Sequence, residues 1–355
     1  MRFLSLFLFA IFASIGSSIV FAQGMSVSGV LESYASINSG AGEAPPTSYG
    51  LQEYANIRMQ AKIGERAVFF SAVNLIAASG DYASEMAENT MIELERLYFK
   101  LKGETVNFDG GFMRLPFGYS QVWGSSDFLN PRNPLLPYAR PKAILGGALA
   151  WYPTDSFKLL EFAVAPRTAG YAVEQHWNRA SFQMLYSFEF PDTVLKQGFH
   201  RTGMSIKADL ELGFVVDMLY TYSKNMKNKK DGLSLSTGFD YSLFNGDLIV
   251  LAEYLYNGAI STTSIAGGGS FFNENYLYTG LTWRFNDYTN AGAALISGID
   301  DRAFLPVLSF SYDIFQGANL SLRAQIPVSG EFGPLPSGRD AGSYFNLESR
   351  LQLRF

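Results

Sequence analysis

The sequence offers few residues that could carry catalysis or hold a metal ion. It contains no cysteine, which excludes a thiolate metal site, a disulfide scaffold and a cysteine nucleophile. The two histidines, His176 and His200, lack metal-ligand spacing, and no acidic or serine partner stands at a fixed distance from them. The run Gly267-Gly268-Gly269 lacks the strand–loop–helix context of a phosphate-binding loop. We therefore expect a protein that is not an enzyme, without catalytic residues, cofactors or metal ligands.

A proline-rich segment, residues 116–143, is more informative. Its five prolines prevent it from pairing as strands and make it stiff, yet it also carries aromatic and charged residues. Since a flexible external loop tends to be polar throughout, we expect this segment to pack inside a larger structure. Trp123 and Phe128 would pack against the wall there, and the alternative is an ordered external flap. The residues expected at the narrowest point are Asp127, Asn130 and Arg132.

Alternation of apolar and polar residues is the dominant pattern along the chain. From Met204 to Tyr222 the even-numbered residues are mostly apolar or aromatic, whereas the charged residues Lys207, Asp209 and Asp217 are odd-numbered. Because successive side chains of a strand point to opposite faces, this pattern predicts strands with one apolar and one polar face. Residues 51–63 and the last residues of the chain, Phe345 to Phe355, alternate in the same way.

Strands of this length indicate a membrane-spanning barrel. A soluble strand needs only ~5–6 residues, whereas a tilted membrane strand needs ~9–11. An open sheet would leave amides unpaired in lipid, so the sheet must close. We predict an all-β fold, a transmembrane antiparallel β-barrel of about 16 strands (roughly 14–18). The expected strands are 25–37, 51–63, 66–79, 91–102, 105–115, 144–152, 157–166, 179–190, 200–223, 232–244, 247–258, 275–285, 289–297, 303–313, 318–328 and 343–355.

The connections between these strands predict which end of the barrel faces which compartment. Gly64-Glu65, Gly103-Glu104 and Asn245-Gly246 are short turns at one end, and longer loops gather at the other. Short periplasmic turns and long extracellular loops are typical of membrane barrels, so we expect both termini in the periplasm. Two assignments determine the predicted number of strands. The stretch 167–178 is interpreted as an external loop, and 200–223 as one long strand, because a two-residue turn would reverse its alternation.

The first residues predict export. Residues 1–22 combine one charge, Arg2, with an apolar run and small residues before Gln23, the layout of a cleaved signal peptide. A single membrane-anchoring helix is the alternative. The remaining barrel, residues 23–355, has 26 basic and 32 acidic residues once Arg2 is removed, a net charge of −6. No clustered basic face suggests a nucleic-acid partner. We expect the bacterial outer membrane as its location.

Two segments resemble bacterial outer-membrane porins. The last strand, LESRLQLRF, alternates and ends on the aromatic Phe355, which porins use as a signal for the barrel-assembly machinery. The segment from Gly110 to Leu136 carries R-x-P-F-G followed by W-G and D-x-x-N-P, a pattern similar to porin-like barrels. The resemblance implies that the long third external loop folds inward and narrows the channel. It also implies periplasmic chaperones, outer-membrane lipid and small solutes as partners, with trimers being common among porins.

If polar faces point inward, the charges of the lumen fall on two walls. The alternative is that these charges merely pair between neighbouring strands. Across water, opposed walls would create a transverse field that aligns polar solutes. The basic wall comprises Arg58, Arg96, Arg323 and Arg350, together with Lys62, Lys100, Arg284 and Arg354. The acidic wall comprises Glu211, Asp217, Asp240 and Glu253, together with Glu161, Glu189 and Asp209.

The predicted function is passive diffusion of small hydrophilic solutes across the outer membrane. A barrel of about 16 strands is wide enough to hold water. One alternative is a non-conducting surface barrel whose extracellular loops bind external partners, as an adhesin or receptor does. Another is an enzyme at the barrel rim, although such barrels are usually smaller.

Overall fold

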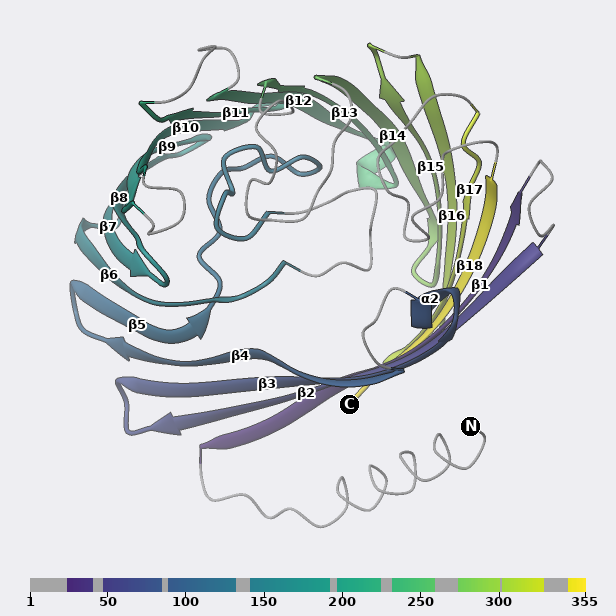
Figure 1. The fold of residues 1–355 in the computed structure, drawn as a ribbon, viewed down its shortest axis with the longest axis horizontal. Helices are drawn as coiled ribbons and strands as arrows, with labels where there is room; N and C mark the ends of the chain where they lie inside the picture. The colour runs from purple at the N-terminus through teal and green to yellow at the C-terminus, as the bar shows by residue number, and fades with distance from the viewer. Residues whose placement is uncertain are drawn as a thin grey trace.

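Alternating strands close this chain into a single β-barrel. In the computed structural model, eighteen strands form one antiparallel sheet in which β18 pairs with β1 (Figure 1). The predicted fold class is confirmed, with eighteen strands instead of sixteen. The structure describes residues 24–40, 47–84, 89–131, 141–191, 197–224, 232–258, 274–300, 302–328 and 344–355, so the predicted signal peptide lies outside it. No helix within these ranges is long and apolar enough to cross a membrane.

The strands follow one another around the barrel in chain order, and each pairs with its neighbours in sequence. In the described part of the chain, two short helical elements accompany them, α2 (Asp81–Ser84) and η2 (Phe244–Gly246). The strands are β1 (Met25–Gly40), β2 (Thr47–Ile63), β3 (Ala67–Gly80), β4 (Thr90–Lys102), β5 (Val106–Met113), β6 (Ile144–Thr154), β7 (Phe157–Val164), β8 (Thr168–Trp177), β9 (Ala180–Glu189), β10 (Phe199–Asp209), β11 (Gly213–Tyr222), β12 (Leu233–Leu243), β13 (Leu248–Asn257), β14 (Asn275–Asn286), β15 (Thr289–Gly298), β16 (Ala303–Phe315), β17 (Ala318–Gln325) and β18 (Tyr344–Arg354).

One of the two additional strands is β8, which occupies most of the predicted external loop 167–178. Its inward side chains include Gly170 and Ala172, and Ala172 is buried in an apolar cluster of the lumen. The inner face of β8 is therefore small and partly apolar, so the strand lacks the polar–apolar contrast that reveals the others. His176 lies on this strand, where its Nδ1 is 2.9 Å from the Ser181 hydroxyl.

The other missed strand arises from a turn inside residues 200–223. Residues 210–212 separate β10 from β11, and Met204 pairs with Met218 across the hairpin. A turn of three residues returns the chain with the same parity, so the alternation continues unbroken through it. A two-residue turn would have reversed the pattern. Glu211 is at the apex of this turn and not on the lumen wall, which corrects its predicted position.

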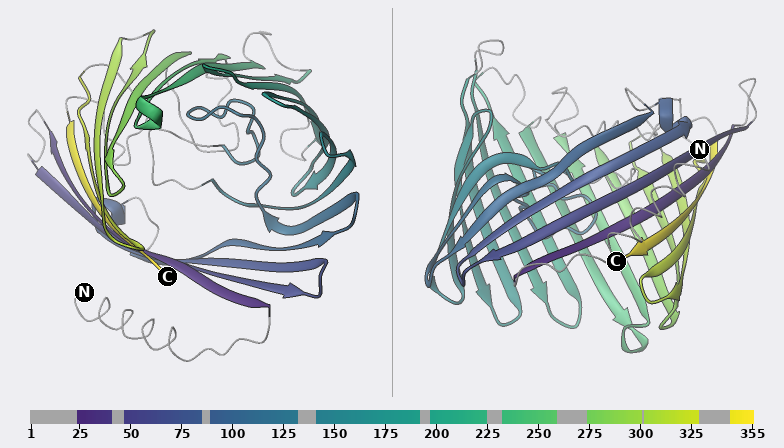
Figure 2. Two further views of the ribbon diagram at one scale, coloured as in Figure 1. Left: turned by 180° about the vertical axis from the view of Figure 1, so that it is seen from behind. Right: turned by 90° about the horizontal axis from the view of Figure 1, so that it is seen from below.

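The two ends of the barrel differ in the length of their connections. At one end the turns are two to four residues long. Residues 155–156 form one of the shortest turns and residues 244–247 the longest. The opposite end carries the longer connections, including residues 114–143 and 258–274 (Figure 2). The expected strands also imply a periplasmic connection at residues 191–199, which is wrong, because the added strand β8 moves the connection after β9 to the long-loop end. Because the number of strands is even, β1 begins and β18 ends on the side of the barrel that carries the short turns.

The seam between first and last strands is closed by the terminal residue. The backbone of Phe355 and that of Gly29 exchange two hydrogen bonds, with N···O distances of 2.8 and 3.1 Å. The Phe355 ring lies over Gly29, where an added Cβ would come within 2.3 Å of it. The terminal phenylalanine thus completes the pairing of β18 with β1, and a side chain at position 29 would displace its ring.

Candidate functional site

The inner wall of the barrel divides into two arcs of different chemistry. Along β6 to β16 many inward side chains are apolar and buried, including Phe162, Leu185, Leu219, Leu255 and Leu305. Along β1 to β5, β17 and β18 the inward side chains are mostly polar or charged. This second set includes Glu32, Asn56, Arg58, Asn74, Arg96, Lys100, Arg323, Glu348 and Arg350.

The segment that follows β5 covers the apolar arc. Residues 114–131 lie inside the ring of strands, where the chain loops back across the lumen (Figure 1). Phe117 and Phe128 stack with ring centroids 6.0 Å apart, and Phe117 packs against Phe162 of β7 at 5.4 Å. Leu115 joins the same cluster. The segment therefore buries apolar side chains of the wall that would otherwise face water.

Trp123 fixes the far end of this segment. Its side chain is 3% exposed and packs against Tyr276 of β14 with ring centroids 5.5 Å apart. Ile296 and Leu305 complete this second cluster. The indole Nε1 donates a hydrogen bond to the carbonyl oxygen of Glu253 at 3.0 Å, so the polar end of the ring is satisfied as well.

Two carboxylates hold the backbone of the segment against the wall. Asp217 of β11 accepts hydrogen bonds from the amides of Tyr119 (3.0 Å) and Ser120 (2.8 Å). Glu253 of β13 accepts from the amides of Gln121 (3.1 Å), Val122 (3.1 Å) and Trp123 (2.9 Å), and from the Ser120 hydroxyl. Five consecutive amides are thus bound by two acidic side chains that are 0% and 1% exposed.

Gly118, in the R-x-P-F-G motif, permits this close approach. It adopts a φ of +85°, which side chains disfavour, and an added Cβ would lie 2.1 Å from the Ser126 hydroxyl and 2.4 Å from Asp217. Its amide donates to the side chain of Gln183 at 2.9 Å. The glycine of the motif is therefore required for packing against β9 and β11.

The motif residues predicted at the constriction are buried within the segment itself. Asn130 is 1% exposed; it accepts from the amide of Leu115 (2.7 Å) and donates to the carbonyl of Lys142 (2.6 Å). Asp127 is 5% exposed and accepts from the amide of Asn130 at 3.1 Å. Both residues therefore shape the segment and do not face the pore, which corrects the prediction. Arg132 lies outside the described residues.

Tyr119 presents a neutral phenol toward β8. Burial raises the pKa of Tyr119 above its usual value of 10, and the neighbouring Glu174 carboxylate raises it further. The hydroxyl donates to Glu174 at 3.1 Å, and Glu174 also accepts from Lys158 at 3.0 Å. Glu174 was missed in the sequence because it lies on the unrecognised strand β8.

The acidic wall differs from the predicted one in three respects. Glu211 lies in a turn, as described above. Glu161 points outward, because the register places its neighbours Lys158 and Phe162 on the inner face of β7. Asp217 and Glu253 are inward but are covered by the segment they bind. Asp240 is inward and accepts a hydrogen bond from the Gln121 side chain at 3.0 Å.

The four arginines of the basic wall all lie on inward positions. In the register, Arg350 stands opposite Tyr34 and Ser321, and Arg323 opposite Glu348. Arg58 and Arg96 flank Ala72 of β3. Several carry acidic or amide partners: Arg350 pairs with Glu32 at 2.5 Å and Arg58 donates to Asn56 at 2.5 Å.

Two further charged residues of this wall were missed. A register shift in β4 leaves Glu95 as an extra inward residue beside Arg96, and its side chain is buried. Arg114, which follows β5, binds Glu95 at 2.9 Å. A bulge interrupts strict alternation, so counting alternate residues cannot place Glu95.

A second element approaches the polar arc from the long-loop end. The helix α2 carries Tyr82, which is buried in a cluster with Tyr34 and Tyr54 on the inner face of β1 and β2. Its hydroxyl donates to Glu348 at 3.4 Å. Figures 1 and 2 show α2 on the inner side of β1 and β18.

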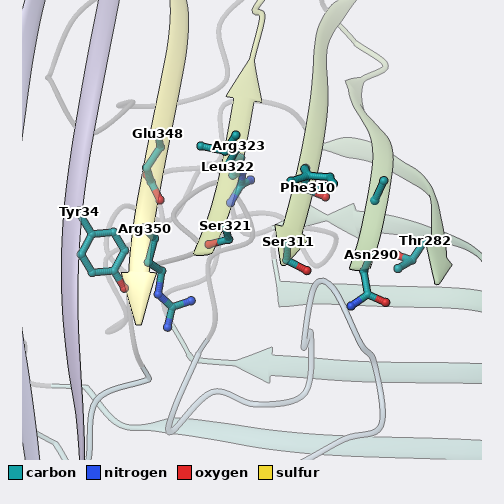
Figure 3. Close-up of a pocket in the computed structure, with 12 residues that line it drawn as sticks. Tyr34, Thr282, Asn290, Phe310, Ser311, Ser321, Leu322, Arg323, Glu348 and Arg350 are labelled. Atoms are coloured by element: carbon teal, nitrogen blue, oxygen red, sulfur yellow. The ribbon is translucent and has the colours of Figure 1, made fainter. Parts of the chain in front are cut away.

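A hollow with polar and apolar lining residues remains open between these elements. It has a volume of about 240 Å³ and lies against β14 to β18 and β1. Figure 3 shows Arg350, Ser321, Ser311 and Asn290 on successive strands along its lining. No group of three or more potential metal ligands occurs among the described residues.

Comparison with known proteins identifies the barrel at the level of fold. No family model and no curated protein matches the sequence. Among solved structures, OccK9 (OpdG) of Pseudomonas aeruginosa superposes with a TM-score of 0.64 at 14% identity, covering 93% of this chain and 98% of that chain. OccAB4 of Acinetobacter baumannii gives 0.61 at 10% identity, covering 94% and 99%. OpdQ of Pseudomonas aeruginosa gives 0.59 at 11% identity, with the same coverage.

Proposed function

We propose that this protein, which has the fold of outer-membrane porins, forms a water-filled channel for small hydrophilic solutes in the outer membrane of a Gram-negative bacterium. The observation that carries the proposal is the division of the inner wall. The segment 114–131 covers the apolar arc, whereas the arc bearing Arg58, Arg96, Arg323 and Arg350 stays lined with polar groups. A barrel that served only as a scaffold would have no need of a charged, uncovered inner arc.

The folded-in segment makes the channel selective by size. Eighteen strands enclose a lumen too wide to be filled by wall side chains alone. Because the segment is fixed by Asp217, Glu253 and two apolar clusters, it occupies a constant part of that lumen. Solutes would pass between the segment and the polar arc.

The charges support a transverse field across this passage. Positive groups gather on the polar arc, and Asp217, Asp240 and Glu253 lie on the opposite side behind or beside the segment. The amides bound to Asp217 and Glu253 spread the negative charge of these two carboxylates but do not cancel it. Low-dielectric walls focus such a field into the water between them, so polar solutes would align as they cross.

Planar-bilayer recording of the purified full-length protein tests this function. We expect stepwise, ohmic single-channel currents in KCl after insertion. A folded barrel that inserts but carries no current would contradict the proposal and favour the alternative of a surface barrel that binds external partners through its loops. Folding is checked separately by circular dichroism, which should show predominantly β-structure.

A further inference from the structure

Two rows of polar side chains run across neighbouring strands and line the hollow of about 240 Å³, together with Ala291, Phe310 and Leu322. In the first row, Asn290 of β15, Ser311 of β16 and Ser321 of β17 stand opposite one another in register, followed by Arg350 and Tyr34. In the second row, Thr282 of β14 is followed by Gly292, Ser309, Arg323 and Glu348. Figure 3 shows labelled members of these rows, among them Asn290, Ser311 and Arg323, on neighbouring strands along the hollow.

Glycine at position 292 leaves the centre of the second row open. An added Cβ there would lie 2.7 Å from the Ser309 hydroxyl and 3.8 Å from the Thr282 hydroxyl. The gap therefore separates two hydroxyl groups that both face the hollow. Among the described residues, the side chains of Thr282, Asn290, Ser309, Ser311 and Ser321 form no hydrogen bond with another side chain, so they are available to a solute.

The charges that border the hollow compensate one another. Arg350 is paired with Glu32 at 2.5 Å, and Glu32 also accepts from the Tyr34 hydroxyl at 2.5 Å. Arg323 stands opposite Glu348 in the register. Two guanidinium groups thus stand beside two carboxylates, and the formal charge of these four side chains is zero. A simple anion would find Arg350 already paired and would face Glu348, which as a carboxylate can only accept hydrogen bonds.

Polyhydroxylated solutes match this lining. A hydroxyl group both donates and accepts, as do the serine and threonine side chains and, through separate atoms, Asn290. A solute with several hydroxyls can donate to Glu348, accept from Arg323 and exchange hydrogen bonds with the serine row. From this arrangement we infer that the hollow is a binding site for a neutral polyhydroxylated solute of the size of a monosaccharide, an inference that rests on the proposed channel function.

Ligand-observed saturation-transfer NMR with the full-length protein in detergent tests the site directly. D-glucose is the polyhydroxylated probe and succinate the hydroxyl-free anionic probe. We expect saturation transfer to glucose and little to succinate. The triple variant Ser309→Ala, Ser311→Ala, Ser321→Ala should bind glucose about tenfold more weakly, because two or more hydrogen bonds are lost. Serine-to-alanine changes at these inward positions leave the strands paired and the barrel intact.

The matched control is Ser242→Ala on β12, an inward serine outside the hollow, which should leave glucose binding unchanged. Equal transfer to succinate and glucose, or glucose binding that the triple variant does not alter, would overturn the inference. The NMR result does not depend on conduction, so a barrel that binds glucose without conducting would refute the channel alone. In a conducting channel, millimolar glucose should shorten open times, and less so in the triple variant.

Discussion

At the scale of single residues, the acidic side chains of the lumen have a structural role that their charge alone does not reveal. Asp217 and Glu253 bind five successive amides of the segment 114–131 and are almost fully buried. Charge-assisted hydrogen bonds of this kind are stronger than neutral ones, and a buried carboxylate left without them is destabilising. These two residues therefore determine where the segment sits.

Glu253→Gln should loosen the segment. A neutral glutamine accepts through one oxygen only, so several of the contacts to Ser120 and residues 121–123 are lost, at a cost of about 2–3 kcal/mol in docking free energy. We expect acrylamide to quench the fluorescence of Trp123 more strongly in this variant, after subtraction of the signal from a Trp123→Phe background.

Asp240→Asn is the matched control for this experiment. Asp240 accepts only one hydrogen bond from the segment, from the Gln121 side chain, and it is partly exposed. Its replacement should change the quenching far less. Equal quenching of Trp123 in wild type and Glu253→Gln would mean that the apolar clusters alone hold the segment.

At the scale of elements, the segment between β5 and β6 and the wall beneath it form one unit. The wall supplies apolar side chains on its inner face, which a water-filled barrel would not otherwise carry, and the segment covers them. Two clusters separated along the segment, around Phe117 and around Trp123, fix it at both ends. Its position inside the barrel is therefore rigid, and it should limit the cross-section of the passage.

Deletion of residues 120–138 should raise single-channel conductance, because an obstruction is removed from the lumen. Bilayer recording in KCl measures this directly. The deletion also exposes Leu255 and Leu219 to water, so the yield of folded barrel should fall. A second variant, Asp217→Asn with Glu253→Gln, keeps every residue of the segment and should instead increase current noise. Unchanged conductance after the deletion would show that the segment does not limit flow.

At the scale of the whole molecule, the four arginines of the predicted basic wall lie on one arc of the lumen, where Glu32, Glu95 and Glu348 accompany them. Arg58, Arg96, Arg323 and Arg350 lie on one arc, while the acids on the other arc are largely covered by the segment. The water of the passage is therefore in closer contact with the basic arc. Fixed charges along a pore set its preference between cations and anions.

Reversal of two of these charges should shift ion selectivity. Arg323→Glu together with Arg350→Glu moves the reversal potential in a KCl gradient toward cation preference, because both side chains border the hollow in the lumen. Arg66→Glu is the control: Arg66 lies in the turn after β2 with its side chain 72% exposed, and charges beyond about 10 Å are screened at 0.1 M salt. An unchanged reversal potential would place the narrow zone away from Arg323 and Arg350.

The alternation of residues along the chain determined the fold class by itself. Alternation is a local property, imposed on a strand by lipid on its outer face and water or polar groups on its inner face. The inward positions of Arg58, Arg96, Arg323 and Arg350 follow from the same local rule.

Only the tertiary structure decided which inward positions face water. Where the segment 114–131 packs, the inner wall is apolar, so polar residues no longer mark the inner face; this is why Glu161 and β8 were misassigned. The burial of Asp217 and Glu253 depends on contacts between residues about one hundred or more positions apart. The burial of Asp127 and Asn130 depends on the shape of the folded segment. The three-residue turn between β10 and β11 preserves parity, so local alternation does not reveal it. The bulge at Glu95 interrupts the alternation, and only the register with the partner strand shows that Glu95 points inward.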